Sequence, residues 1–493
     1  MKCIKIHNCD SVAVSVLNLK AGENVTVGDK SIILLNDIPA GHKFAIRDIA
    51  AGEDIIKYGF PIGHAKSDIK IGEHVHTHNV ISNLGNLLSY CYDPDFSDLK
   101  AIKPVVFNGF KRSDGKVGIR NEIWIIPTVG CVNPVVRAIE KKSQVFKKGS
   151  IDGIYSFNHP YGCSQLGGDM QNTLKYLSSL IKHPNAAAVL VVGLGCENGN
   201  INELKKVLGD YDESRVKYLN SQDFDDEIAE GVAIIEKLAN TAAGYTREPC
   251  LLSDLIIGLK CGGSDGFSGI TANPLLGAAS DRIIAMGGSA VLTEVPEMFG
   301  AETILMNRCR TKEVFFKTVD LINGFKEYFM RYGEKVDENP SPGNKAGGIT
   351  TLEDKSLGCV QKGGSAPVED VLCYGDTVRK HGLSLLQAPG NDLVASSALA
   401  ASGAQIVLFT TGRGTPFGCP VPTVKISSNS DLANRKSNWI DFDAGALLNG
   451  KSLSELTDEF LNYIVKLASG EVKTSAEADD NREFAIFKDG VTL

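Results

Sequence analysis

The sequence has no long hydrophobic run and no sign of an export signal. None of its 493 residues lies in an uninterrupted apolar stretch that approaches the length of a membrane-spanning helix. The first segment, residues 1–14, lacks the apolar core and the small-residue cleavage site of a signal peptide. We therefore expect a cytoplasmic protein with no membrane partner.

Positive charge is in deficit as well. The 51 Lys and Arg residues are outnumbered by 59 Asp and Glu residues, which gives a formal net charge of -8. An acidic surface argues against a nucleic-acid partner. It is compatible with a small anionic substrate, because such a substrate meets only the charges of its own pocket.

Two informative motifs are missing. No G-x-G-x-x-G follows a strand, since the segment 193–200 (GLGCENGN) has the wrong spacing, and a dinucleotide site is poorly supported. None of the 12 cysteines forms a Cys-x-x-Cys pair, which argues against a zinc ribbon. In a cytoplasmic chain these cysteines should be reduced, and most should be buried thiols.

The first hundred residues have the pattern of a compact all-β unit. The motif Asp-Ile-x-x-Gly occurs three times, at residues 37–41, 48–52 and 68–72. In each copy an Asp and a Gly enclose a turn between short apolar stretches. Residues 92–98 are polar and turn-rich and are typical of a linker. The sequence therefore predicts a small β domain over residues 1–98.

Beyond residue 104 the sequence alternates strand, glycine loop and helix. Near-continuous Val, Ile and Leu strands such as 186–192 precede glycine-rich loops and amphipathic helices. This alternation is typical of α/β domains with mainly parallel, buried strands. A boundary near Thr246–Pro249 divides the remainder. We predict one α/β domain over residues 104–246 and a second over residues 249–493.

Four cysteines lie beside or near glycine in loops that follow the predicted strands: Cys131, Cys163, Cys196 and Cys261. Ligands of open α/β sheets bind at the carboxyl ends of the strands, and a thiolate suits iron or zinc. The alternative is a set of unrelated semi-buried thiols. We expect at least one of Cys163, Cys196 and Cys261 to be a metal ligand or an active-site residue.

Three histidines alternate in the segment 73–79. On a strand, His74, His76 and His78 would project to the same side. Three imidazoles on one face suit a divalent metal or an anionic substrate, whereas the alternative is the polar face of an edge strand. Because the chain has only 9 histidines, this spacing favours contact with metal or substrate by His76 or His78.

A third group of residues could hold or act on an anionic substrate. Arg413 lies between two glycines after an apolar strand and could bind a carboxylate through two nitrogens. Lys345 and Lys355 flank a Gly-Gly-Ile-Thr-Thr loop, although each could be a solvated surface charge. Further candidates are His159 and Glu197 for catalysis and Ser264, Asn391 and Asp392 for substrate binding. For several of these the alternative is a structural role such as capping a helix.

Long segments of the chain resemble one known family. They include GFKRSDGKVGIRNEIWIIPTVGCVN (residues 109–133), KCGGSDGFSGITANPLLG (260–277) and ENPSPGNKAGGITTLEDKSLGC (338–359). These segments are similar to the altronate/galactarate dehydratase family, and residues 38–79 resemble its SAF domain. The resemblance covers essentially the whole chain in collinear order.

The resemblance implies a multidomain fold, with a SAF-like β-clip domain followed by α/β domains. It also implies a bacterial lyase of hexuronate catabolism that converts D-altronate to 2-dehydro-3-deoxy-D-gluconate and water. Members of the family depend on Fe(II), sometimes replaced by Mn(II). An iron–sulfur cluster stays a candidate cofactor if the cysteines share one pocket. A homo-oligomer is compatible with the sequence.

Such a dehydration removes the proton on C2 of the acid with a general base, while a divalent cation stabilises the added negative charge. We expect the cation to be held by some of His76, His78, Cys163, Cys196 and Cys261. The base would be His159 or Lys345, with Lys355 as a second choice. Arg413 would hold the substrate carboxylate.

Three other functions stay open on the sequence. The nearest is a sister activity, either dehydration of galactarate or loss of sulfite from a sulfo-acid. A sensor that binds a sugar acid without turning it over would give no keto acid. A redox iron–sulfur protein would take up electrons reversibly.

Overall fold

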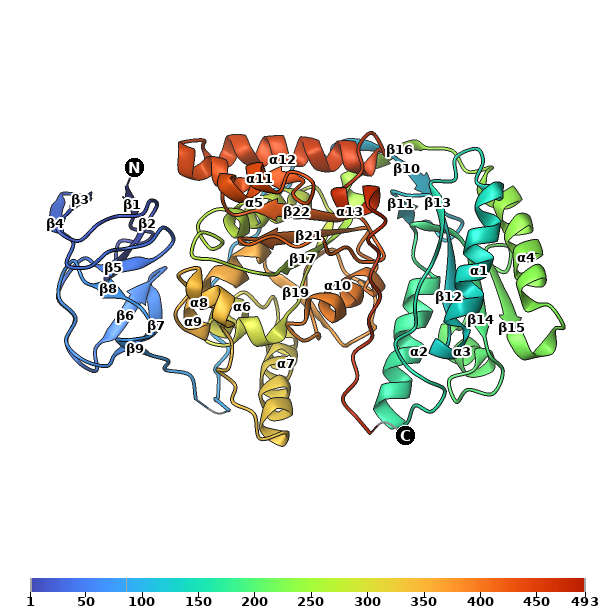
Figure 1. Ribbon diagram of the computed structural model, residues 1–493, viewed down its shortest axis with the longest axis horizontal. Coiled ribbons are helices and arrows are strands. Elements are labelled where there is room, and N and C mark those ends of the chain that lie inside the picture. Colours follow the sequence, from blue (N-terminus) through green and yellow to red (C-terminus); the bar gives the residue numbers. More distant parts are fainter. Residues whose placement is uncertain (1, 86, 492–493) are drawn as a thin grey trace.

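The computed structural model describes residues 2–85 and 87–491, and it arranges the chain as three regions (Figure 1). The N-terminal β unit lies at one end of the molecule. The region that follows it in the sequence lies at the opposite end, and the C-terminal region fills the space between them. The segment that links the first two regions therefore runs along the central region, which is formed by residues later in the sequence.

The N-terminal unit consists of small antiparallel sheets, as the sequence predicts. One sheet has the order β1-β2-β5-β8, the second is the hairpin β3-β4, and the third has the order β6-β7-β9. The strands are β1 (Cys3–Ile4), β2 (Val12–Ser15), β3 (Asn24–Val27), β4 (Lys30–Ile33), β5 (Lys43–Ala45), β6 (Asp54–Lys57), β7 (Phe60–Ala65), β8 (His74–Val75) and β9 (Val80–Ile81).

The repeated Asp-Ile-x-x-Gly motif accounts for this fold. The three isoleucines, Ile38, Ile49 and Ile69, are fully buried or nearly so. The glycines that close the copies have left-handed φ angles between 80° and 84°, which side chains disfavour. The aspartates accept backbone N–H groups from neighbouring turns; Asp48, for example, accepts from the third copy at 2.9 Å. The second and third copies are thus joined by reciprocal hydrogen bonds, while Asp37 of the first copy accepts from Ala21.

The second region contains a four-stranded parallel sheet of order β13-β12-β14-β15. Helices α1 and α4 pack together and against this sheet, while α2 and α3 pack together and α2 contacts α10 of the C-terminal region. The elements are β10 (Val106–Lys111), β11 (Val117–Gly118), β12 (Glu122–Pro127), α1 (Asn133–Ser143), β13 (Gly153–Ser156), α2 (Gly167–Ile181), β14 (Ala186–Gly193), α3 (Ile201–Leu208), β15 (Val216–Asn220), α4 (Glu227–Ala242) and β16 (Glu248–Leu251). Strands β10 and β16, which enter and leave the region, pair with each other.

The C-terminal region is built on a seven-stranded sheet of order β19-β20-β18-β17-β21-β22-β23, in which every pairing is parallel. Its elements are β17 (Ile256–Cys261), α5 (Ala272–Ala285), β18 (Ser289–Leu292), α6 (Glu302–Met306), α7 (Lys312–Arg331), α8 (Pro342–Ala346), α9 (Leu352–Cys359), β19 (Val368–Leu372), β20 (Gly382–Leu386), α10 (Asp392–Ala401), β21 (Ile406–Thr411), β22 (Thr423–Ser427), α11 (Ser430–Arg435), β23 (Phe442–Asp443), α12 (Leu453–Ala468) and α13 (Ser475–Ala478). The predicted succession of a β domain and parallel α/β sheets is confirmed.

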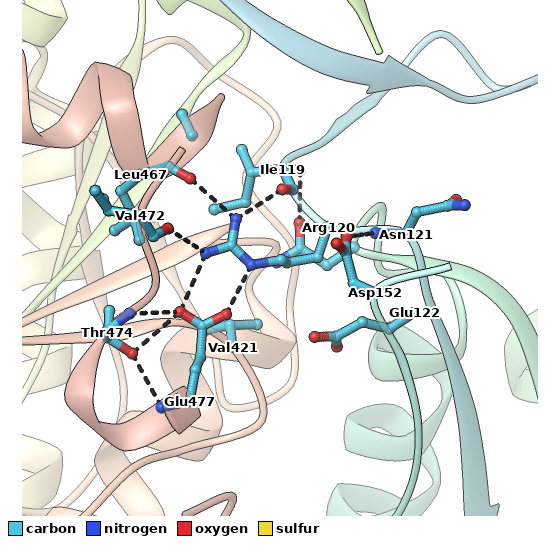
Figure 2. A network of polar contacts seen from close by, with 12 residues as sticks. Ile119, Arg120, Asn121, Glu122, Asp152, Val421, Leu467, Val472, Thr474 and Glu477 are labelled. Atoms are coloured by element: carbon cyan, nitrogen blue, oxygen red, sulfur yellow. Dashed lines mark hydrogen bonds and ion pairs between the residues drawn. The ribbon is translucent and has the colours of Figure 1, made fainter. Parts of the chain in front are cut away.

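A buried arginine joins the second region to the C-terminal one (Figure 2). The guanidinium of Arg120 forms a two-pronged ion pair with Glu477, through Nε at 2.7 Å and Nη2 at 3.1 Å. Nη1 donates to the carbonyls of Ile119 and Leu467, both at 2.9 Å. The side chains of both charged residues are at most 5% exposed. The contact between these two regions therefore includes a buried ion pair, in which each charge compensates the other.

The end of the described chain returns to the second region. Phe484 and Ile486 belong to the same apolar cluster as residues of β12 and α2. The backbone N–H groups of Asp489 and Gly490 both donate to the carboxylate of Asp169 in α2, at 2.9 Å. The predicted domain boundaries stay predictions. No helix in residues 2–85 and 87–491 has the length and apolar character needed to cross a membrane.

Candidate metal centre

Strand β17 lies at the point where the order of strands in the large sheet reverses. From β17 the chain first builds β18 on one side and later returns to add β21 on the other side. In open parallel sheets such a reversal leaves a crevice outside the carboxyl ends of the strands, where ligands bind. Cys261 is the last residue of β17 and is 1% exposed. The topology therefore places this thiol at the position favoured for a ligand.

Two further side chains reach Cys261 from separate elements. Glu297 comes from the turn after β18, and its Oε2 lies 3.0 Å from Sγ of Cys261. Cys359, the last residue of α9, brings its Sγ to 3.5 Å from Cys261 and 3.3 Å from Glu297. All three side chains are buried. Among the residues that the structure describes, no other three Cys, His, Asp or Glu residues place ligand atoms within 4.8 Å of one another.

Three lysines surround this group. Lys362 donates to Sγ of Cys261 at 3.0 Å, and Lys355 pairs with Oε1 of Glu297 at 2.7 Å. Lys260 pairs with Asp392 at 2.7 Å and also with Glu294. All three lysines are buried and are held by these anions.

Backbone strain marks the same site. Glu294 adopts a left-handed conformation with φ of 68°, which a residue with a side chain seldom occupies. Its carboxylate accepts the backbone N–H of Cys261 at 2.9 Å and also binds Lys260. Such conformations persist where the surroundings enforce them, and they cluster at functional sites. Here the strained residue fixes the backbone that carries the first thiol.

The electrostatics favour one thiolate in the pair of cysteines. The hydrogen bond from Cys359, with help from Lys362 and Lys355, lowers the pKa of Cys261 to about 6. The same bond and burial raise the pKa of Cys359. Burial opposes the charge on Glu297, but Lys355 and Lys362 nevertheless lower its pKa to about 2. At neutral pH the group therefore offers a thiolate and a carboxylate, with a thiol that binding of a cation would deprotonate.

A cavity of about 500 Å³ opens beside Cys261 and Glu297. Lys345, Lys355 and Asp392 also line it. The size is within the range of small-molecule sites. A small acid in this cavity would meet both the ligands and the cationic groups.

The donor set fits a divalent ion of intermediate softness. Two sulfurs and one carboxylate oxygen suit Fe(II) or Zn(II), whereas Mn(II) prefers sites made of oxygen. Three protein ligands leave positions for a substrate, which is the arrangement of catalytic rather than structural metal sites. Of the predicted metal ligands, Cys261 belongs to this group.

Several predicted residues do meet at this cavity. Lys345, Lys355 and Asp392 line it together with Cys261. Asn391 caps α10 by accepting two backbone N–H groups, so the structural alternative applies to its side-chain oxygen.

Two more predicted residues lie on the adjoining loops. Ser264 is buried, and its hydroxyl has no partner, while its carbonyl accepts from Asn344, which lines the cavity, at 2.8 Å. Arg413 is exposed, and its Nη1 lies 3.4 Å from the carbonyl of Gly343. Its guanidinium is thus near the loop that bounds the cavity, with capacity to bind an anion.

Four predicted residues lie elsewhere, at the carboxyl edge of the second region's sheet. Glu197 accepts from Thr128 at 2.5 Å and from the backbone of Gly195 at 2.7 Å, so its carboxylate holds its own loop. His159 is buried, and this burial lowers its pKa to about 4. Cys163 and Cys196 are exposed thiols on the same edge. The structure therefore does not bring these four residues to Cys261.

The predicted histidines form part of a larger cluster at the boundary between the β unit and the C-terminal region. His42 joins them, with its Nδ1 3.1 Å from Nε2 of His74 and its Nε2 3.3 Å from the carbonyl of Ala346. His76 contacts the hydroxyl of Thr350 at 2.9 Å. The ring of His78 lies 5.5 Å from that of His74, centre to centre. This cluster packs against the loop that connects Lys345 with Lys355.

Burial, together with neighbouring cationic groups, lowers the pKa of His74 to about 3 and that of His76 to about 4. Neutral imidazoles can bind a metal or donate to an anion. Beneath them, Asp354 forms buried ion pairs with Lys43 and Lys57, each at 2.8 Å. The β unit thereby positions the loop that carries two cavity lysines, and metal binding by His76 and His78 stays a prediction.

One short segment has the spacing of a phosphate-binding loop without its structure. Residues 445–452 (GALLNGKS) match G-x-x-x-x-G-K-S. Most of this segment belongs to a 3-10 helix over Ala444–Asn449, and Lys451 pairs with Glu459. Ser452 caps α12 through a capping box with Glu455. The segment therefore starts a helix and cradles no phosphate.

Family models match three successive parts of the chain. The altronate/galactarate dehydratase SAF domain matches residues 1–83, the second domain of D-galactarate dehydratase/altronate hydrolase matches residues 109–243, and the C-terminal domain of D-galactarate/altronate dehydratase matches residues 252–492. The fold and site thus define a sugar-acid dehydratase composed of a SAF domain and two α/β units.

Curated relatives extend over the whole length. The chain is 53% identical to an altronate dehydratase of Escherichia coli (strain K12), with 100% of both chains covered, and 54% identical to one of Bacillus subtilis (strain 168), with 99% of each covered. It is 32% identical to the galactarate dehydratase (L-threo-forming) of Escherichia coli (strain K12), over 96% of this chain and 94% of that one. The chain belongs to the altronate/galactarate dehydratase family.

Proposed function

We propose that this protein dehydrates D-altronate to 2-dehydro-3-deoxy-D-gluconate with the help of Fe(II) in the cytoplasm. The observation that carries the proposal is the buried group of Cys261, Glu297 and Cys359 at the wall of a cavity lined by lysines. Identity above 50% to altronate dehydratases over the full length supports altronate as the acid.

The difficult step is removal of the proton on C2, because the neighbouring carboxylate is already negative. Cys261, Glu297 and Cys359 would hold a divalent ion, which would supply a Lewis acid for the charge that develops on that carboxylate. The protein contributes positive charge through Lys355, which remains protonated because Glu297 raises its pKa. A protonated ammonium suits stabilisation of the anion and donation to a leaving hydroxyl, and it is unsuited to act as the base.

The base is then assigned to Lys345, which lines the cavity and, unlike Lys355, pairs with no carboxylate among the described residues, so that no carboxylate holds it in its charged form. Arg413 is assigned to the distal oxygens of the substrate or to its carboxylate, since it approaches the same loop at Gly343. His159 and Glu197 lie on the other sheet, so no step of the reaction is assigned to them. The histidine cluster contacts the loop between Lys345 and Lys355 and so helps to position both lysines.

The test is an anaerobic assay of the whole chain with Fe(II). A panel of altronate, galactarate and sulfolactate is incubated with the enzyme, and formation of 2-keto-3-deoxy acid or release of sulfite is measured. We expect turnover of altronate and its loss in Glu297→Gln and Cys261→Ser variants. Glu313→Gln and Cys373→Ser, both exposed and remote from the cavity, are the matched controls. Binding of altronate without keto acid in the intact enzyme would instead identify a sensor.

A further inference from the structure

Three cysteines of the second region occupy equivalent places in its parallel sheet. Cys131 follows β12, Cys163 follows β13 and Cys196 follows β14. These strands are neighbours in the order β13-β12-β14 and run parallel, so their carboxyl ends share one edge. Each cysteine is directly preceded by glycine, at Gly130, Gly162 and Gly195. The same dipeptide is thus presented three times at one sheet edge.

Hydrogen bonds connect the loop of Cys131 with that of Cys163. The N–H of Gly130 donates to the carbonyl of Tyr161 at 2.7 Å. Asn133 and His159 exchange two bonds, at 2.9 and 3.0 Å. A Cβ on Gly130 would lie 2.9 Å from the Tyr161 carbonyl, so glycine is required for this approach.

The loop of Cys196 reaches the same place from the other side of β12. The N–H of Asn198 donates to the carbonyl of Cys163 at 3.0 Å. This bond spans from the end of β14 to the end of β13, across the central strand. The three loops are therefore joined across β12, and all three thiols are exposed. The thiol of Cys196 also accepts from the side-chain amide of Gln222, after β15, at 3.7 Å.

These thiols are not arranged as ligands of a single ion. The one group of three ligand atoms within 4.8 Å in the described part of the chain is that of Cys261, Glu297 and Cys359. A multinuclear cluster is several ångströms across, so the cysteines that hold it stand farther apart than ligands of one ion. Convergent but separated thiols, flanked by glycine backbone, match the cluster and not the ion.

A buried imidazole adds a second observation at this edge. His159 is 2% exposed, and its Nε2 has no partner although the surroundings are desolvated. The loop after Cys196 contributes the buried carboxylate of Glu197, whose charge acts on this histidine. A buried nitrogen without a partner is costly unless a ligand or cofactor satisfies it.

We propose that Cys131, Cys163 and Cys196 hold an iron–sulfur cluster of the four-iron, four-sulfide type at the carboxyl edge of the second sheet. Three thiolates supply three of the four iron positions, and the remaining iron faces solvent, where water or a hydroxy acid binds. This site is separate from the Cys261 centre, and whether it binds a cluster can be tested without measuring altronate turnover.

The test is reconstitution of the full chain with Fe(II) and sulfide under anaerobic conditions. Iron, acid-labile sulfide and visible absorption are measured for the native sequence and for Cys131→Ser, Cys163→Ser and Cys196→Ser. Matched controls are Cys9→Ser, Cys91→Ser and Cys373→Ser, which remove the other exposed thiols. We expect about equal amounts of iron and sulfide in the native chain and in the controls, and loss of the sulfide and the absorption band in each of the three variants.

A second measurement does not depend on the folding of any variant. In the native chain, alkylation followed by mass spectrometry should modify Cys131, Cys163 and Cys196 before reconstitution, and all three should be protected after it. Iron without sulfide, or a cluster retained in all three variants, would overturn the proposal. So would continued alkylation of these thiols in the reconstituted protein. Because neither readout uses altronate, failure here leaves the dehydratase assay to be judged separately.

Discussion

Acid should release the metal from the Cys261 centre within a defined pH window. Metal ligation needs the thiolate, and the pKa of Cys261 is lowered to about 6. About nine-tenths of such a group is ionised at pH 7 and about one-tenth at pH 5, so protonation of Cys261 alone should lower the metal affinity by about tenfold over this range. The thiol of Cys359, which must also lose its proton on binding, adds about tenfold per pH unit. The sign is fixed: the charged form binds, and it is lost as pH falls through the pKa.

The measurement is a titration with Co(II), whose thiolate complexes absorb in the near ultraviolet, at several pH values. A Cys261→Ala variant should lose about half of the thiolate absorption and the part of the pH dependence that Cys261 contributes in this window. The histidine cluster would behave differently, because the pKa values of His74 and His76, about 3 and about 4, lie below the window. A metal affinity that stays constant between pH 5 and pH 7, or that falls equally in the Cys261→Ala variant, would refute the reasoning.

Three further outcomes are expected. Glu297→Gln should weaken Co(II) binding at least as much as the roughly 10–100-fold typical of outer-sphere changes, while Glu313→Gln binds normally by the same titration. Arg120→Met should cost about 3–5 kcal/mol in urea unfolding, because Glu477 is left buried without its partner, and Arg120→Met combined with Glu477→Met should recover most of that loss. Arg413→Ala should reduce kcat/KM by about 10–100-fold, mainly through KM, as expected for a lost charged hydrogen bond; unchanged steady-state kinetics would remove its role.

The architecture could be predicted because its signals are local. The Asp-Ile-x-x-Gly copies carry their own core residue and their own turn glycine, which is why they indicated an all-β unit. Continuous apolar strands followed by glycine loops likewise indicated parallel sheets. The same logic predicts a site at Cys261, and the structure places this residue at the end of such a strand.

Local sequence patterns do not predict which residues contact Cys261. Glu297 and Cys359 lie 36 and 98 residues farther along the chain and come from a turn and a helix end. Only the order of strands in the sheet brings them together, and periodicity does not specify that order. Glu197 is a different case. An acidic residue beside a cysteine suggests chemistry, and its oxygens accept N–H groups of its own loop, so its catalytic role stays a prediction.

The tail that contacts Asp169 also constrains how the molecule can be made. Asp489 and Gly490 leave the ribosome after the whole C-terminal sheet, yet their backbone fastens a helix of the second region, which was synthesised some three hundred residues earlier. That region must therefore wait, with its apolar contact surface for Phe484 uncovered, until residues 484–490 have been synthesised. A chain truncated before Phe484 would expose this surface to chaperones and proteases.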